Sequence, residues 1–151
     1  MTAALLTDLI LELFRVNGRL LAAGDALVQD LGLTSARWQV LGAVAMSPVP
    51  LPVAHVARNM GLSRQAVQRV ANELEADGIV AFAPNPHHRR AKLIVLTARG
   101  SDLYDAAAAR QGPWAAALAE GLAPERVADA LDLLRTLRVR LEAGAGDTDE
   151  P

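Results

Sequence analysis

Two polar segments in the middle of the chain carry side chains suited to binding a polyanion. The first is expected on the exposed face of a helix that begins at Ser63, and its polar residues are Arg64, Gln65, Gln68 and Arg69. The second is a turn that contains His88, Arg89 and Arg90. A guanidinium pairs with phosphate, and a glutamine amide can both donate to and accept from the edge of one base. The two segments therefore indicate contacts to DNA, in which glutamine reads bases while Ser63, Arg69 and the turn contact phosphates.

The pattern around Ser63 predicts a helix-turn-helix that would hold this polar face in place. A short helix is expected over residues 53–59, with Pro52 in its first turn, where the missing amide hydrogen would lack a partner anyway. Gly61 can take the positive φ of a tight turn, and Ser63 can cap the next helix, which Gly78 ends. The inward face of that helix is expected to consist of Val67, Val70, Ala71 and Leu74. In such a motif the first helix supports the second in the major groove.

A basic hairpin is expected directly after this motif. Two β-prone runs, residues 79–82 and 93–96, flank the turn-forming sequence NPHHRR at 85–90. This order of elements is that of a winged helix: helix, turn, helix, strand, basic tip and strand. Its wing would place arginine along the DNA backbone or in a minor groove, whose narrow stretches concentrate negative potential.

The rest of the chain is predicted to be helical. Apolar residues recur at helical spacing over 3–28, Thr34 is placed to cap a further helix, and Thr97 begins another, which Gly112 and Pro113 should kink or divide. The last helix opens at Pro124, and its apolar stripe, which needs a partner surface, consists of Val127, Leu131, Leu134, Leu137 and Leu141. The predicted fold class is therefore mainly α with a small β-hairpin wing (α+β).

Composition and charge agree with a DNA-binding module. The 151 residues are enough for one domain with its own core, and only 3% of them are aromatic, which favours helix packing built from Ala, Leu and Val. Residues 51–99 contain seven Arg or Lys and three acidic residues, a net charge of +4, whereas the whole chain carries −2, so the other residues carry −6. A basic centre in an acidic frame is typical of a module that binds a polyanion.

Other classes of function are disfavoured by the residues that the chain contains. It has no Cys, which excludes disulfides, thiolate zinc sites, cysteine nucleophiles and thiol-based sensing. Serine nucleophile motifs and Gly-rich phosphate loops are absent, so we expect neither an enzyme nor a cofactor. His87 and His88 are adjacent and have no third ligand nearby, so we expect a phosphate contact there, and no metal. Charges interrupt the apolar residues 1–21, which predicts a cytoplasmic protein without a signal peptide or membrane span.

Four segments give the chain a resemblance to the MarR family of regulators, which extends from the first helix to Leu141. They are residues 33–41 (LTSARWQVL), 56–69 (VARNMGLSRQAVQR), 74–80 (LEADGIV) and 85–97 (NPHHRRAKLIVLT), with Gly100 after the last. The resemblance implies a homodimer formed by the N- and C-terminal helices, a roughly palindromic DNA operator and, often, release by a small ligand. Arg90 matches the wing arginine of the family, and the exposed recognition-helix positions are occupied by Arg64, Gln65 and Gln68. Where His88 stands, the family often has an acidic residue that steadies this arginine.

We therefore expect a single MarR-like domain over residues 1–143 and a disordered tail at 144–151. Dimerisation helices at 1–30 and 101–143 would surround a winged helix-turn-helix at 33–100. The expected function is ligand-responsive repression by a homodimer on double-stranded DNA, with a small apolar or aromatic-acid effector. Phe14 and Trp38 are candidates for the effector pocket, although such residues on amphipathic helices are more often core. Two alternatives stay open: a winged helix that binds protein, and a helical dimer that binds a small ligand without DNA.

Overall fold

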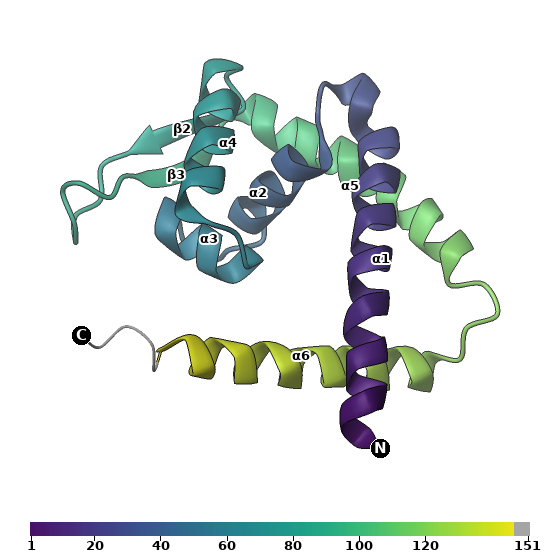
Figure 1. Ribbon diagram of the computed structural model, residues 1–151. Helices are drawn as coiled ribbons and strands as arrows, with labels where there is room; N and C mark the ends of the chain where they lie inside the picture. The colour runs from purple at the N-terminus through teal and green to yellow at the C-terminus, as the bar shows by residue number, and fades with distance from the viewer. Residues whose placement is uncertain (147–151) are drawn as a thin grey trace. The chain divides into compact units, whose positions relative to one another are not determined.

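The helix-turn-helix lies where the sequence predicts it. The computed structural model describes residues 1–146 (Figure 1), and in it α3 (Val53–Met60) and α4 (Arg64–Ala76) are joined by a turn at Gly61, whose φ is 64°. The hydroxyl oxygen of Ser63 accepts a hydrogen bond from the amide of Ala66 at 3.1 Å, so the predicted N-cap is confirmed. Pro52 is the N-cap of α3 with an extended backbone (ψ 160°), whereas the sequence predicts it inside the first turn. Its backbone is extended because Pro52 also belongs to a short strand.

A three-stranded antiparallel sheet carries the wing. β2 (Val80–Ala83) and β3 (Leu93–Leu96) form the predicted hairpin, in the register that pairs Val80 with Leu96. The strand β1 (Leu51–Pro52) pairs with the other edge of β3, so the strand order is β1-β3-β2. Sequence analysis does not predict β1, because two residues show no periodicity. As an edge strand it tolerates Pro52, which has no amide hydrogen to donate.

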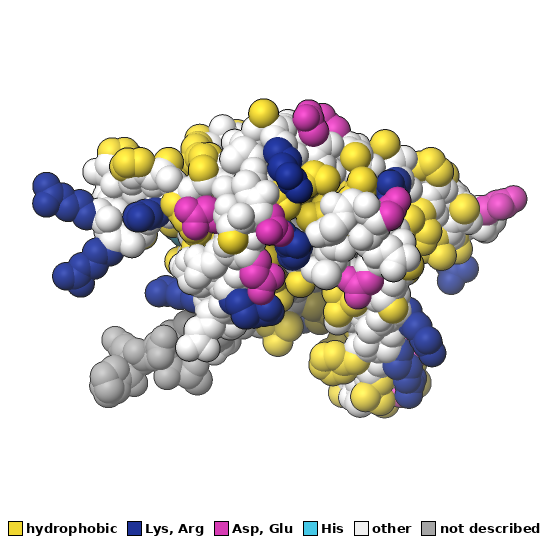
Figure 2. Space-filling model, turned by 90° about the horizontal axis from the view of Figure 1, so that it is seen from above, with side chains coloured by type: hydrophobic (Ala, Val, Ile, Leu, Met, Phe, Trp, Pro, Cys, Tyr) yellow, Lys and Arg dark blue, Asp and Glu magenta, His cyan; other side chains and the backbone are white. Residues whose placement is uncertain are grey.

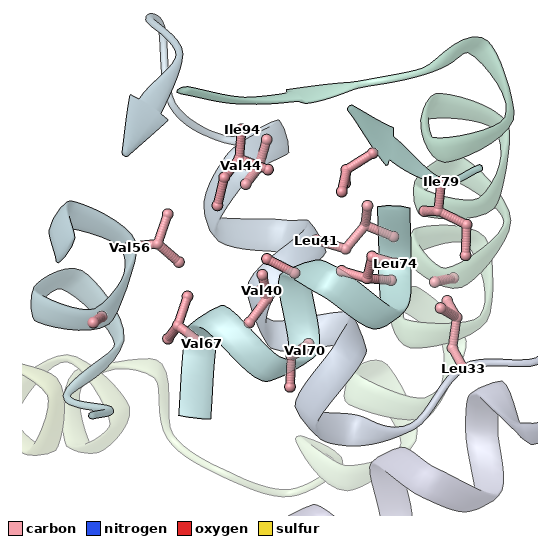
Figure 3. Close-up of a cluster of buried hydrophobic side chains, with 14 of the residues drawn as sticks. Leu33, Val40, Leu41, Val44, Val56, Val67, Val70, Leu74, Ile79 and Ile94 are labelled. Carbon is pink, nitrogen blue, oxygen red and sulfur yellow. The ribbon is translucent and has the colours of Figure 1, made fainter. Parts of the chain in front are cut away.

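One apolar core joins the helix-turn-helix to the hairpin. Figure 3 shows side chains from α2 (Ser35–Ala45), α4 and β3 that point into a common interior. Its largest fully buried members are Leu41 from α2, Leu74 from α4 and Ile94 from β3. Burial of one such side chain contributes about 1.5–3 kcal/mol. Every buried member of this core lies between residues 28 and 107, so the winged helix has its core within the first part of the chain.

Polar contacts hold the junction between α1 (Thr2–Val28) and α2, which a short 3₁₀ turn, η1 (Gln29–Leu31), connects. The side chain of Thr34 accepts a hydrogen bond from the amide of Arg37 at 3.2 Å, which confirms the predicted cap. The amide of Ser35 donates to the Asp25 carboxylate at 2.6 Å, and the Ser35 hydroxyl donates to the carbonyl of Leu21 at 2.5 Å. The carboxylate thus lies at the N-terminus of α2, where the helix dipole favours negative charge.

The helix α5 (Ala98–Leu118) is attached to the hairpin where it begins. Thr97 donates to the carbonyl of Gly78 at 2.6 Å and accepts from the amide of Gly100 at 3.0 Å. A Cβ on Gly100 would overlap the carbonyl oxygen of Ile79, so any side chain at this position would push α5 away from the hairpin.

Further along α5, Arg110 connects the helix to the end of α1. Its guanidinium donates to the carbonyl of Leu27 at 3.0 Å and pairs with Asp30, and this hydrogen bond lowers the pKa of the Asp30 carboxyl. The predicted division at Gly112 and Pro113 is absent, because α5 continues through both residues. Both are exposed, so water can bind the carbonyl that the proline leaves without a helical donor.

The chain falls into two compact units, Met1–Pro113 and Trp114–Pro151, and α6 (Pro124–Gly146) is the main element of the second. Its apolar stripe is exposed: the relative accessibility is 50% for Val127 and 39% for Leu134. The helix extends to Gly146, past the predicted start of the tail at 144, and the rest of that predicted tail, 147–151, lies outside the described residues. No helix in the described part is long and apolar enough to cross a membrane. The assignment of 1–30 and 101–143 to dimerisation stays a prediction.

Candidate nucleic-acid interface

A hollow of about 700 Å³ lies between α4 and the wing. Residues of both predicted segments line it: Arg64, Gln65 and Gln68 from α4, and Arg90 from the hairpin, which also contributes Lys92. All of these residues are exposed. Figure 2 shows Lys and Arg side chains that stand out at the left, the side on which Figure 1 places the hairpin. The fold thus brings the two polar segments together around one concave, basic surface.

The amide of Gln68 is already oriented by its neighbour on α4. Its Nε2 donates a hydrogen bond to Oδ1 of Asn72, one helical turn away, at 2.8 Å. A carboxamide has two N–H donors and an acceptor oxygen, so one N–H and the oxygen of Gln68 remain available to a ligand. This is the donor and acceptor pair that a glutamine uses on the major-groove edge of adenine.

Arg69 lies on α4 but does not line the hollow. Its guanidinium pairs with the carboxylate of Glu73 at 2.9 Å, and both side chains are largely exposed. An exposed ion pair of this kind contributes little stability, so Arg69 can exchange Glu73 for a phosphate at small cost. The predicted role of Arg69 as a phosphate contact stays a prediction.

The wing tip is a tightly bonded loop. Asn85 accepts a hydrogen bond from the amide of His87 at 3.0 Å through its side-chain oxygen, and its Nδ2 donates to the carbonyl of Ala91 at 2.8 Å. The amide of His88 donates to the carbonyl of Asn85 at 3.3 Å. The exposed residues His88 and Arg89 lie in this loop but outside the lining of the hollow, whereas Arg90 belongs to both.

Comparison with known proteins shows which family this winged helix belongs to. A model of the MarR family matches residues 31–91. An uncharacterized protein of Mycobacterium tuberculosis is 36% identical over 135 residues, which cover 89% of this chain and 93% of that protein. A crystal structure of a MarR-family regulator from Rhodococcus sp. RHA1 superposes with a TM-score of 0.77 at 30% identity, over 87% of this chain and 93% of that one. This chain belongs to the MarR family.

A second solved structure is similar to a comparable degree. It is CouR from Rhodococcus jostii RHA1, crystallised with p-coumaroyl-CoA, with a TM-score of 0.78 and 30% identity over 87% of this chain and 92% of CouR. The MarR-family chain described here is therefore a DNA-binding transcription regulator with a winged helix.

Three polar residues that line the hollow were not among the DNA contacts predicted from the sequence: Asn72, Glu75 and Lys92. Asn72 and Glu75 follow Gln68 at four- and seven-residue spacing, so helical periodicity alone could have found them. Lys92 could be found only from the register of the hairpin. Glu75 places one negative charge on an otherwise basic surface, where a carboxylate can accept from the amino group of cytosine.

The predicted effector pocket does not coincide with this hollow. Phe14 lies on α1 with 72% of its surface exposed, and the half-buried Trp38 packs against the core. Neither lines the hollow, so their role in binding an effector stays a prediction. Among residues 1–146, no three His, Asp or Glu side chains come together in a way that could hold a metal ion.

Proposed function

We propose that this MarR-family regulator binds a pseudo-palindromic DNA operator as a homodimer and represses transcription until a small ligand releases it. The observation that carries the proposal is the hollow in which the amide-bearing face of α4 meets the basic wing. Glutamine amides can discriminate bases in the major groove, while arginine and lysine neutralise phosphates beside it. One winged helix presents one such surface, and two related by a two-fold axis match the two halves of a palindrome.

The apolar faces of α1 and α6 support the homodimer. Phe14 and Leu20 on α1 have relative accessibilities of 72% and 45%, and Leu131 and Leu141 on α6 have 46% and 74%. Monomeric proteins rarely expose extended apolar surface of this kind without a partner. A second copy of the chain would cover such faces symmetrically.

Capture of genomic DNA tests the proposal directly. Sheared DNA from the organism that encodes the protein is incubated with the purified protein, and bound fragments are sequenced over a series of salt concentrations. We expect enriched fragments to share an inverted repeat, and their affinity to fall steeply with salt as counterions are released.

An Arg64→Ala/Arg90→Ala double variant serves as the control in the capture experiment, because it removes one guanidinium from each side of the hollow. It should retain little DNA. If the parent protein enriches no common sequence and its binding is insensitive to salt, the protein is instead a protein-binding winged helix or a ligand-binding helical dimer.

We also expect an aromatic acid or its thioester to bind the folded protein. The related CouR was crystallised with p-coumaroyl-CoA, which motivates the choice of compounds. A ligand at a hundredfold excess over its Kd stabilises the native state by about 2.7 kcal/mol, which for a chain of this size raises Tm by roughly 5–10 °C. A thermal-shift screen measures this change, with an aliphatic acid of equal charge as the control. Ligand control is ruled out if no aromatic compound changes either Tm or the affinity for DNA.

A further inference from the structure

One side chain holds the wing loop at its base. Asn85 accepts from the amide of His87 at 3.0 Å and donates to the carbonyl of Ala91 at 2.8 Å. The second bond spans the loop, so Asn85 closes a ring around residues 86–90, which include Arg89 and Arg90. Asn85 is half-buried, whereas residues 86–90 are exposed. The exposed arginines thus stand on a loop whose order comes from a residue beneath them.

The bond from Asn85 is the shortest hydrogen bond of the loop. The backbone adds bonds from the His88 amide to the Asn85 carbonyl at 3.3 Å and from the Ala91 amide to the His88 carbonyl at 3.2 Å. These lengths are at the upper limit for N–H···O bonds. Ala91 directly follows Arg90, and it is held through both its amide and its carbonyl. The bond from Asn85 therefore adds to the backbone bonds that hold the chain next to Arg90.

Both functional groups of the amide are needed for this arrangement. The oxygen of Asn85 accepts within the loop while the nitrogen donates across it. An ionised aspartate could accept from His87 but could not donate to Ala91, and an alanine could do neither. Within residues 85–91, Asn85 makes both of the hydrogen bonds that involve a side chain.

We propose that Asn85 is a positioning residue for DNA binding, which orders the wing tip before Arg89 and Arg90 meet the DNA. Fixing the backbone of a flexible residue costs conformational entropy, and a loop ordered in advance does not incur this cost on binding. Asn85 contributes to affinity without touching DNA. The inference rests on the proposed DNA binding and adds a residue that acts through the wing arginines.

The test combines Asn85→Ala with a second background that lacks both wing arginines, Arg89→Ala/Arg90→Ala. Amide hydrogen exchange of the free protein reports the order of residues 86–91. Affinity is measured for a mixed-sequence DNA duplex at low salt, which requires no knowledge of the operator. Asn59→Ala, at an exposed asparagine of α3 that does not line the hollow, is the matched control for the loss of an amide.

We expect Asn85→Ala to accelerate exchange only in the wing loop and to weaken DNA binding about tenfold or more, because both wing loops must then be ordered when DNA binds. In the background without the wing arginines, Asn85→Ala should cause no further loss of affinity, because the groups it positions are gone. Equal losses in both backgrounds, or unchanged exchange, would overturn the positioning role. If the Arg89→Ala/Arg90→Ala variant loses affinity for DNA but Asn85→Ala does not, only the role of Asn85 is overturned. If the parent protein does not bind the duplex, the proposed function itself is contradicted.

Discussion

The Leu134→Glu variant is expected to be a monomer whose affinity for operator DNA is about a thousandfold lower or worse, because each buried carboxylate would cost several kcal/mol in a two-fold interface. Leu134 lies in the apolar stripe of α6, where it is 39% exposed in a single chain. A two-fold interface would bury the carboxylate twice, and a monomer would hold only one half-site. Sedimentation at micromolar concentration and DNA titration measure the two effects.

The winged helix itself should remain folded in the Leu134→Glu variant. Its buried core lies between residues 28 and 107, and no residue of α6 belongs to it. A folded monomer would therefore show that the loss of DNA binding comes from dissociation. Val139→Glu is the matched control, since Val139 is exposed and lies away from the stripe by helical spacing. A parent protein that sediments as a well-folded monomer would contradict the dimer, as would a Leu134→Glu variant that still dimerises.

Local chemistry made much of the winged helix predictable. The caps at Thr34 and Ser63 and the positive φ at Gly61 depend only on adjacent residues, so they can be read from the sequence. The prediction that Gly112 and Pro113 could divide the helix was wrong for a different reason. A proline removes one helical hydrogen bond, but at an exposed position water can bind the freed carbonyl, and Pro113 is exposed within α5.

Contacts between distant residues limited the prediction of the site. The strand β1 exists only because Leu51 pairs with Ile94, a contact that no local pattern reveals. Lys92 reaches the hollow through the register of the hairpin, which two four-residue strands do not specify from sequence. The hydrogen bond from Asn85 to Ala91 likewise joins the two ends of a loop. Asparagine is common at the start of a turn, but its partner across the loop is not evident from the sequence.

Substitutions of Gln68 and Arg90 should separate the reading of bases from the binding of the backbone. Gln68→Ala is expected to cost roughly 1–3 kcal/mol at the preferred operator and to relax the choice of base at one position in each half-site, because a bidentate amide contact is lost. The hydrogen bond from Gln68 to Asn72 leaves the donor and acceptor that fit adenine, so the relaxed position should be an A·T pair. Gln29→Ala, at an exposed glutamine in η1, is the control and should change neither affinity nor preference.

Arg90→Ala should weaken binding to all sequences together, because a charge at the wing tip neutralises phosphate or lies in the minor groove without recognising one base. The slope of log K against log salt should become shallower by about one unit for each wing that loses a phosphate contact. If the wing enters a narrow A·T stretch, a modest preference for that composition is lost as well. Both variants are titrated against matched and scrambled duplexes at several salt concentrations. An Arg90→Ala protein with unchanged affinity and slope would contradict the role of Arg90 as a contact to DNA.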